Sequence, residues 1–351
     1  MEKHIVIDGS IGEGGGQILR TSLSLAALTQ RSFEIHSIRA NRRHPGLRPQ
    51  HLAAVRAVAQ ITGAEVAGDS ENATSLRFAP RTIQRGSYRF TIGTAGSVTL
   101  LAASILPPLL FAAGPSTIVL QGGTHVPFSP VFHYLQENFL PFLRRMGGEA
   151  SAVLDKWGWY PGGGGSCTLR VTPCPGLKGL QVPERGRLRR LDLMLGLANL
   201  PLHIVDREEK QLRACLGKKG YEFARRFEPA PSPGQGNVLY LRGEYENSLA
   251  GFSVLGKKGK PAEQVAQELC RAFLHFAASA ASVDKHLADQ LLLYMALARG
   301  NSMIITEEVT GHLTTGIGII EKFIPVRFKL DPDVRSVEVT GAAYTPGIRI
   351  S

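Results

Sequence analysis

Apolar residues along the chain fall into short blocks whose spacing predicts alternating strands and helices. The block at 5–7 predicts a strand, and a glycine-rich segment separates it from an apolar, helix-forming stretch at 17–28. A strand at 33–38 and a second helix at 49–62 follow. This second helix begins at a proline and is followed by a glycine, the usual punctuation of helix ends. The first part of the chain therefore predicts one helix-and-sheet unit.

The same order of elements returns further along the chain. A helix-forming stretch begins near residue 97, 80 residues after the first, and a strand at 117–120 and a helix at 130–146 follow it. A third copy at the same spacing is missing, and the best match is a helix at 284–299 with a strand at 302–306 behind it. This displacement predicts three repeated units, with a separate segment inserted into the third.

Residues 183–276 have the character of that inserted segment, because they are richer in charged residues and contain a proline-rich turn. They predict two strands and two helices of their own, at 191–197, 238–242, 208–216 and 262–277. We therefore predict an α/β (α+β) protein with two domains. The large domain, 1–182 and 277–351, holds the three repeats, and the small α+β domain, 183–276, is inserted into it.

The composition is that of a globular protein, since 43% of the 351 residues are hydrophobic and 20% are charged. No apolar stretch reaches the roughly 20 residues that span a membrane. The longest candidate, at 98–113, is interrupted by Pro107 and Pro108. The residues Met1-Glu2-Lys3-His4 lead directly into the first strand without a signal peptide. No membrane association is expected.

The number and spacing of the cysteines indicate whether the protein works in a reducing or an oxidising cellular compartment. Cys167, Cys174, Cys215 and Cys270 lack the spacing of metal ligands and are too few for a disulfide framework. Together with the missing signal peptide, they indicate the reducing cytoplasm.

A formal net charge of +11 and a pI near 9.7 favour a polyanionic partner. Basic residues gather in one turn and in the helix after it: Arg39, Arg42, Arg43, His44, Arg48 and His51. The planar fork of arginine suits phosphate better than solubility alone requires. A solvated basic face is the alternative interpretation.

The glycine-rich segment 9–16, between the first strand and the first helix, is a candidate phosphate site. Backbone N–H groups at a helix N-terminus favour an anion. Glu13 within the segment would repel phosphate unless a divalent metal lay between them, which indicates a metal–polyphosphate site. A tight turn without any ligand explains the glycines equally well, and the Walker A pattern is absent.

His312 is the candidate nucleophile. It follows a predicted strand at 303–309 and lies in a turn of small residues, which leaves its ring room to meet a ligand. An unprotonated imidazole can attack an activated phosphorus. The motifs of zincins, of serine hydrolases and of ligases with a lysine nucleophile are absent. A purely structural histidine is the alternative.

Several segments together resemble the signature of the RNA 3′-terminal phosphate cyclase family. They occur in the family's order over nearly the whole chain, at 8–20, 37–40, 45–47, 50–52, 96–97, 122–124, 160–161, 286–290 and 312–313. The resemblance implies three repeats similar to the C-terminal domain of translation initiation factor 3, with a small inserted domain. It also implies a chemistry in which ATP and Mg²⁺ or Mn²⁺ place AMP on a histidine. The AMP then passes to the 3′-phosphate of RNA, and the neighbouring 2′-hydroxyl closes a 2′,3′-cyclic phosphate and releases AMP.

The resemblance also implies roles for individual residues. His312 matches the nucleophile and Glu13 the metal ligand. Arg39, Arg42 and His51 match groups around the RNA phosphate. The positions that match the ATP site are Arg20, Ala103, Pro130, His286, Leu287, Ala288, Asp289 and Gln290.

Two positions depart from the family pattern. Ala103 stands where relatives carry a glutamine, and His286 stands where a tyrosine often packs on the adenine. A different aromatic residue, Phe128 or Tyr134, is the alternative cover for the base.

Two competing functions remain at this point. One is that of the family's non-catalytic branch, which acts in ribosome assembly and lacks the nucleophilic histidine. The other is an enolpyruvyl transferase, whose large domains share a related repeat architecture but need no ATP.

Overall fold

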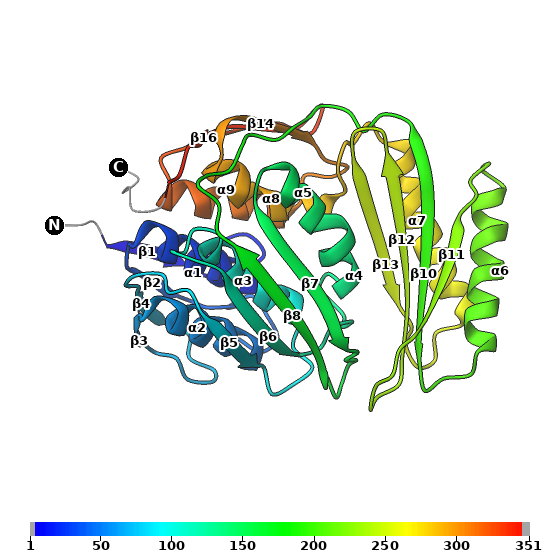
Figure 1. Ribbon diagram of the computed structural model, residues 1–351, viewed down its shortest axis with the longest axis horizontal. Helices are drawn as coiled ribbons and strands as arrows, with labels where there is room; N and C mark the ends of the chain where they lie inside the picture. The colour runs from blue at the N-terminus through cyan, green and yellow to red at the C-terminus, as the bar shows by residue number, and fades with distance from the viewer. Residues whose placement is uncertain (1–3, 346–351) are drawn as a thin grey trace.

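The chain folds into three units of the same kind, with a further sheet-and-helix segment within the third (Figure 1). The computed structural model describes residues 4–345. The first unit consists of β1 (Ile5–Asp8), α1 (Gly16–Thr29), β2 (Phe33–His36), α2 (Pro49–Thr62), β3 (Glu65–Ala67) and β4 (Leu76–Ala79). The second consists of β5 (Ser87–Thr91), α3 (Val98–Leu109), β6 (Ser116–Gly122), α4 (Phe132–Tyr134), a π-helical turn (Leu135–Phe139), α5 (Leu140–Arg145), β7 (Glu149–Lys156) and β8 (Gly165–Thr172). The third consists of β9 (Gln181–Val182), α8 (Lys285–Leu297), β14 (Arg299–Ile305), α9 (Gly311–Phe323), β15 (Phe328–Asp331) and β16 (Ser336–Ala342).

The three units share one sheet topology. Their strand orders are β1-β2-β4-β3, β5-β6-β8-β7 and β9-β14-β16-β15. In each sheet the first two strands of the unit pair in parallel, and the fourth strand pairs antiparallel with both the second and the third. The mixed α/β fold expected from the sequence is therefore confirmed. The likeness to translation initiation factor 3 stays a prediction.

The core lies where the helices of the three units meet. Helix α1 packs against α2, α3 and α9, and α8 packs against α9. The strands alternate accordingly, with Ile5 and Ile7 buried while Val6 between them is 55% exposed. This packing brings the N-terminal end of α1 to the N-terminal end of α9, far apart in sequence.

Between β9 and α8 the chain forms a fourth sheet with helices on one face. Its elements are β10 (Leu188–Ala198), α6 (His203–Gly217), β11 (Ala224–Pro229), β12 (Gly236–Tyr245), β13 (Leu249–Leu255) and α7 (Ala262–Ala278). The strand order is β11-β10-β12-β13. Helices α6 and α7 cover one face with an apolar cluster of their own, and Met194, Val238 and Tyr240 on the other face join the core of the three units. The domain boundaries at 182/183 and 276/277 stay a prediction.

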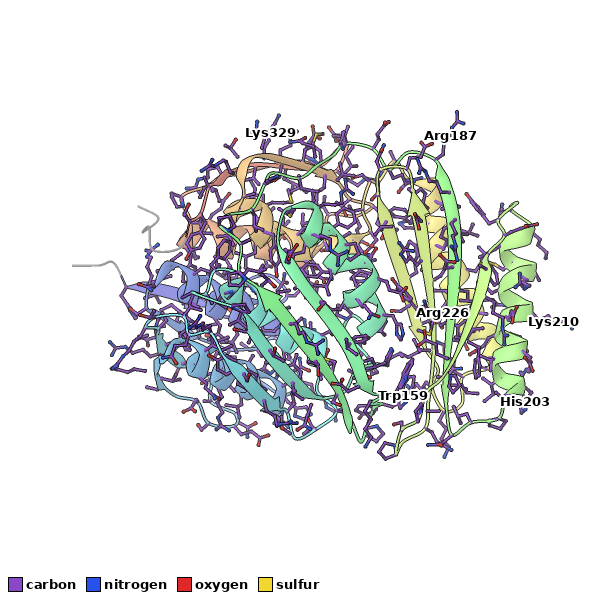
Figure 2. The ribbon with its side chains drawn as sticks, in the orientation of Figure 1. Trp159, Arg187, His203, Lys210, Arg226 and Lys329 are labelled. Atoms are coloured by element: carbon purple, nitrogen blue, oxygen red, sulfur yellow. A yellow bond between two sulfur atoms is a disulfide. The ribbon has the colours of Figure 1, made fainter. Side chains whose placement is uncertain are left out.

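A buried chain of polar groups joins the second unit to this fourth sheet. His125 Nε2 lies 2.9 Å from His133 Nδ1, and His133 Nε2 lies 3.1 Å from the Glu228 carboxylate on β11. Arg226 pairs with the other oxygen of Glu228, and both Arg226 and Trp159 at this boundary are labelled in Figure 2. The inserted segment is thus held by polar as well as apolar contacts.

Most expected elements lie within a few residues of their predicted ends, and two of the differences concern the first and second units. The strand predicted at 33–38 ends at His36, because Ser37 and Arg39 adopt left-handed φ values of 54° and 55°. The helix predicted at 130–146 begins at Phe132 and widens into the π-helical turn, where Pro141 has no N–H to donate to a regular ladder. Met1, Glu2 and Lys3 lie outside the described residues.

The expectation drawn from the cysteines is wrong for one pair. Cys215 on α6 and Cys270 on α7 form a disulfide, whereas Cys167 and Cys174 are buried free thiols. No local pattern indicates this pair, because the two positions are 55 residues apart and meet only when the two helices pack on the same sheet face. Cysteine usage therefore does not by itself indicate a reducing compartment. Within residues 4–345, no helix has the length and apolar character needed to cross a membrane.

Candidate active site

The segment between β1 and α1 bends so that its middle faces α9. Gly12 and Gly14 have φ values of 60° and 53°, in the left-handed region that favours glycine. Asn41 holds the loop from outside by donating from Nδ2 to the Ser10 carbonyl oxygen at 2.9 Å. Gly15, the N-cap of α1, provides no side-chain hydrogen bond to the N–H groups of the first turn. Those N–H groups can donate hydrogen bonds to a bound anion.

His312 lies opposite this loop, and its two ring nitrogens face different partners. Nε2 lies 3.1 Å from Glu13 Oε2, and Nδ1 lies 2.5 Å from Gln17 Oε1. Gln17 Nε2 also donates to the His312 carbonyl oxygen at 3.1 Å. On the far side of Glu13, Arg42 Nη2 lies 3.3 Å from the same carboxylate oxygen. The structure thus brings Glu13, Arg42 and His312 into one cluster.

The sequence predicted that His312 lies in a turn. In the structure it is the second residue of the helix α9 (Gly311–Phe323). The strand before it ends at Ile305 rather than at 309, and Thr310 caps the helix by accepting the N–H of Leu313 on its hydroxyl at 3.0 Å. Small residues around His312 suggested a turn, yet glycine and threonine also occur at helix starts when a capping residue precedes them. The helix fixes the direction of the ring more firmly than a turn would.

The His312 ring is neutral near pH 7. Burial lowers the pKa of its imidazole below the usual value, and Glu13 partly offsets this effect. Side chains that lower the pKa further are Arg20, Arg42 and His286. The N-terminal end of α9 carries a partial positive charge, which also disfavours a protonated ring. A neutral imidazole keeps one lone pair and can act as a nucleophile.

Glu13 provides one carboxylate toward a metal ion. Within residues 4–345 there is no group of three or more His, Cys, Asp or Glu side chains that could hold a metal. The Glu13 carboxylate is 42% exposed, so a cation there would take its other ligands from phosphate oxygens and water. Mg²⁺ is usually held in this way, by one or two carboxylates together with substrate phosphates. The donor set fits Mg²⁺ or Mn²⁺ that arrives with a polyphosphate.

His51 lies beneath the glycine loop as a neutral donor, not as a basic group. A Cβ at Gly16 would collide with His51 Nε2, so the ring touches the start of α1. His51 Nδ1 accepts the backbone N–H of Arg48 at 3.2 Å, which leaves the ring proton on Nε2. Burial lowers the pKa of His51 to about 3, and the neighbouring arginines act in the same direction. Near pH 7 the ring therefore offers a phosphate an N–H rather than a charge.

Arg20 and Asp289 interact on the inner side of the cluster. Burial lowers the pKa of Arg20 to about 10, while Asp289 raises it, so the guanidinium remains charged near pH 7. Burial raises the pKa of Asp289 to about 8; Asp284 and Glu13 raise it and Arg20 lowers it. Asp289 is mostly protonated near neutral pH, and this part of the site is therefore positive.

Arg39 is placed differently from the other predicted phosphate ligands. Its Nη1 donates to the carbonyl oxygens of His44 and Gly46 at 2.7 and 3.0 Å, and so braces its own loop. Arg42 on the same loop is exposed and reaches Glu13. Of the three residues expected around an RNA phosphate, Arg42 belongs to the cluster around His312, His51 lies against the start of α1, and Arg39 supports its own loop.

The predicted nucleotide segment forms the first turns of α8. Asp284 caps this helix, and its Oδ1 accepts the N–H groups of His286 and Leu287 at 3.1 and 3.0 Å. His286 is exposed, Asp289 and Gln290 are partly buried, and Gln290 Nε2 donates to the His286 carbonyl oxygen at 2.8 Å. Leu287 and Ala288 are buried in the core, so any contact they make with a nucleotide is through the backbone.

Ala103 and Pro130 lie on one side of α3. Thr99, one turn before Ala103, donates its hydroxyl to the Pro130 carbonyl oxygen at 2.7 Å. Ala103 itself is exposed, which leaves open space where a longer side chain would stand. Phe128 nearby in the chain is fully exposed and available to cover a base. Tyr134 is excluded from that role, because it is buried and donates to Asp284 Oδ1 at 2.6 Å.

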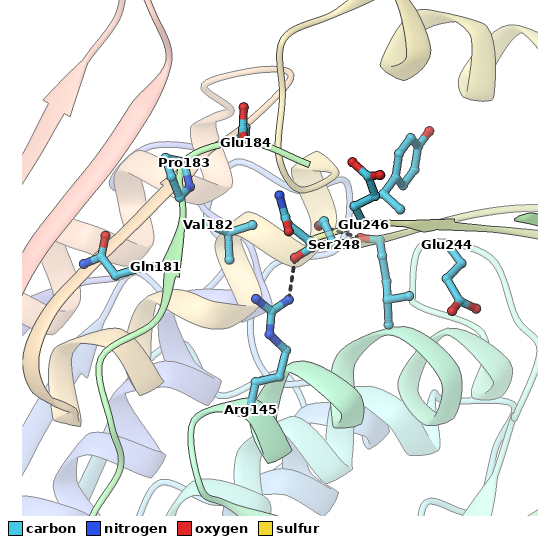
Figure 3. Close-up of a pocket in the computed structure, with 11 residues that line it drawn as sticks. Arg145, Gln181, Val182, Pro183, Glu184, Glu244, Glu246 and Ser248 are labelled. Atoms are coloured by element: carbon cyan, nitrogen blue, oxygen red, sulfur yellow. Dashed lines mark hydrogen bonds between the residues drawn. The ribbon is translucent and has the colours of Figure 1, made fainter. Parts of the chain in front are cut away.

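A pocket of about 470 Å³ lies elsewhere, between the inserted segment and the three units (Figure 3). Arg145 points into it and donates to the Asn247 carbonyl oxygen at 2.8 Å. Glu184, Glu244 and Glu246 also line it. None of the residues predicted for the site lines this pocket, so the cluster around His312 is separate from it.

Two residues of the site escaped prediction from the sequence. Gln17 contacts both the ring and the backbone of His312, and Asp284 positions the nucleotide segment. A signal existed for Gln17, because Gln17 and Arg20 are three residues apart and share one face of α1. Nothing in the sequence indicated that this face meets α9.

The comparisons with known proteins agree over almost the whole chain. The family model described as RNA 3′-terminal phosphate cyclase matches residues 11–330. The protein of that name from Pyrobaculum neutrophilum is 41% identical over 343 residues, which cover 96% of this chain and 99% of that protein. The one from Trichormus variabilis is 45% identical over 328 residues, covering 91% and 94%.

Among solved structures, the enolpyruvyl transferase NikO from Streptomyces tendae aligns with a TM-score of 0.42 and 10% identity, over 99% of this chain and 50% of that one. That likeness is too low to bear on fold or function. The sequence relatives, in contrast, are matched nearly end to end at more than 40% identity. The chain therefore belongs to the RNA 3′-terminal phosphate cyclase family.

Proposed function

We propose that this protein is an ATP-dependent RNA 3′-terminal phosphate cyclase that works through an adenylylated His312. The observation that carries the proposal is the position of His312, a neutral imidazole that faces Glu13 near the start of α1, whose first turn has no side-chain cap. Relatives named RNA 3′-terminal phosphate cyclase align over almost the whole chain, which supports the same substrate class.

In the first step, a lone pair of the His312 ring attacks the α-phosphorus of ATP. The N–P bond forms, the bond to the bridging oxygen breaks, and diphosphate leaves. Arg20 supplies positive charge for the phosphates, and His51 supplies a neutral N–H donor. Glu13 would hold Mg²⁺ or Mn²⁺, which neutralises the charge of the triphosphate when bound.

In the next steps, AMP moves to RNA and then leaves. An oxygen of the RNA 3′-phosphate attacks the phosphorus of the adenylylated histidine, and the N–P bond breaks. The neighbouring 2′-hydroxyl then attacks the activated 3′-phosphorus, its proton passes to solvent, and AMP is the leaving group. Arg42 stands at the exposed side of the cluster, where the RNA end would enter.

The competing functions are less well supported. The non-catalytic branch of the family lacks the nucleophilic histidine, whereas His312 is present and held by two hydrogen bonds. The enolpyruvyl transferase interpretation finds no support in the curated relatives, which are named as cyclases. We place the reaction in the cytoplasm, where ATP and RNA ends occur together.

The proposed function is tested with an oligonucleotide that ends in a 3′-phosphate. We expect an ATP-dependent product that resists phosphatase, as a 2′,3′-cyclic phosphate does. The matched substrate with a 2′-deoxy terminal nucleotide should accept AMP but fail to cyclise, because the attacking hydroxyl is missing. Absence of any AMP transfer would favour the assembly branch, and turnover without ATP would contradict the proposal.

A further inference from the structure

The side chain of Gln17 bridges two parts of His312. It extends from the second residue of α1 to the first turn of α9, 295 residues along the chain. One end of its amide meets the ring at Nδ1 and the other meets the backbone carbonyl oxygen of the same histidine. No other hydrogen bond to the His312 ring, apart from the Glu13 contact, occurs in residues 4–345.

The orientation of the Gln17 amide follows from donor and acceptor chemistry. A backbone carbonyl oxygen can only accept, so the amide NH₂ faces the His312 carbonyl oxygen. The amide oxygen then faces Nδ1 and can itself only accept, so Nδ1 carries the ring proton. Glu13 Oε2, 3.1 Å from Nε2, also only accepts and competes for the single proton of the neutral ring. The Gln17 contact is the shorter of the two, so the proton stays on Nδ1 and Nε2 holds the lone pair.

The consequence concerns which nitrogen reacts. We infer that Gln17 is a positioning residue that fixes His312 in the Nδ1–H tautomer and presents Nε2, on the Glu13 side, as the attacking nitrogen. The part of this inference that names Nε2 as the attacking atom rests on the proposed function. The tautomer itself is a property of the free protein and can be measured without ATP.

An amide suits this position for a physical reason. A carboxylate could also accept the Nδ1 proton, but it would add a second negative charge beside Glu13 and next to an incoming triphosphate. The amide orients the ring without that repulsion.

The variants separate positioning from packing. Gln17→Met has nearly the same length but neither accepts nor donates strongly, whereas Gln17→Glu keeps an acceptor for the Nδ1 proton. Gln264→Met makes the same chemical change near the start of α7 in the inserted segment, away from His312, and serves as the control. Urea unfolding checks that each variant is folded.

The first measurement is the tautomer, read from nitrogen–proton correlation spectra of ¹⁵N-histidine-labelled protein at about pH 8, where histidine is neutral. The His312 signals are identified by their loss in His312→Ala. We expect a protonated Nδ1 in wild type, in Gln17→Glu and in Gln264→Met, and a shift toward a protonated Nε2 in Gln17→Met. A wild-type ring protonated on Nε2, or an unchanged pattern in Gln17→Met, would overturn the inference.

The second measurement is the single-turnover rate of AMP attachment at saturating ATP. Loss of a group that orients a reacting side chain typically costs about 10- to 100-fold in activity, so Gln17→Met should be slower by that factor with little change in the ATP concentration for half-maximal rate. An unchanged rate would contradict the positioning role. If wild type forms no AMP adduct while its tautomer still depends on Gln17, the proposed function fails and the tautomer assignment stands.

Discussion

At the scale of single residues, two histidines beside the glycine loop have opposite hydrogen-bonding roles. His312 donates through Nδ1 and keeps Nε2 unprotonated, whereas His51 accepts through Nδ1 and carries its proton on Nε2. A neighbouring group determines which ring nitrogen carries the proton. For His312 this group is the Gln17 amide, and for His51 it is the backbone N–H of Arg48. In the proposed function, His312 is the nucleophile and His51 is a neutral donor to phosphate.

The buried His51 ring should make folding stability depend on pH. Its pKa is about 3 in the folded protein and about 6.5 when unfolded, so only the unfolded chain takes up a proton as the pH falls below 6.5. The stability linked to His51 is complete above pH 6.5 and declines toward pH 3. Between pH 7.5 and pH 5 the expected loss is about 2 kcal/mol.

Urea unfolding at the two pH values measures this loss. His51→Gln keeps an acceptor for the Arg48 N–H and removes the titration, so its stability should fall about 2 kcal/mol less than that of wild type over the same range. Other buried histidines, such as His125, contribute equally to both proteins and cancel in the comparison. Identical pH dependence in both proteins would show that the ring is not held neutral.

Replacing Glu13 should weaken the response to metal. Glu13→Gln keeps the size of the side chain but provides a weaker ligand for a divalent cation, so AMP attachment should slow tenfold or more, about 1.4 kcal/mol of barrier. Glu34→Gln removes an exposed carboxylate from β2 in the same unit and is the control. A Glu13→Gln protein with wild-type rate and wild-type Mg²⁺ dependence would show that Glu13 is not a ligand.

Residue types and their spacing were enough to predict His312, Glu13 and the basic cluster as candidates. The residues that hold them in place could not be predicted from the sequence. Gln17 and Asp284 act through contacts between units, and no local pattern encodes such contacts. The same limit applies to His51, whose charge state depends on burial and on three arginines that the fold collects.

At the scale of elements, the start of α9 determines where His312 points. Thr310 accepts the Leu313 N–H and so closes the first turn, and Gln17 then holds the ring from α1. The sequence contained the pattern of a helix start here, a threonine followed by apolar residues at helical spacing. The small residues beside His312 concealed it and favoured a turn instead.

Removing this cap should affect both stability and reaction. Thr310→Ala should cost about 1 kcal/mol, the usual value for a lost N-cap, and should slow AMP attachment because the His312 turn frays. Thr310→Ser retains the hydroxyl and should behave as wild type. Urea unfolding and single-turnover labelling provide the two readouts. Equal stability and rate for the alanine variant would mean that the cap does not hold the site.

At the scale of the whole molecule, the inserted segment has a core of its own on one face and joins the common core on the other. Periodicity and the spacing of the repeats were enough to predict the mixed α/β fold. They could not predict the pairing of Cys215 with Cys270, or the buried chain from His125 to Glu228, because both form between separate elements.

The disulfide should stabilise the inserted segment without affecting the site. It closes a loop of 55 residues, for which chain entropy gives about 4 kcal/mol of stabilisation. A Cys215→Ser, Cys270→Ser protein should therefore be cut faster by protease within the inserted segment but should attach AMP at the wild-type rate. Thiol titration of the unfolded, unreduced wild type should find two free thiols, those of Cys167 and Cys174. Four free thiols would contradict the disulfide.

The most direct test of the account is whether AMP becomes attached to His312. The protein is incubated with Mg²⁺ and ATP labelled at the α-phosphate, and the labelled peptide is identified by mass spectrometry. We expect label on His312 that is lost in acid and kept in alkali, as a phosphoramidate requires. His36 is an exposed histidine on β2, and the His36→Ala control should take up label like wild type. The His312→Ala protein should take up no label. A folded His312→Ala protein that takes up label like wild type would contradict the account.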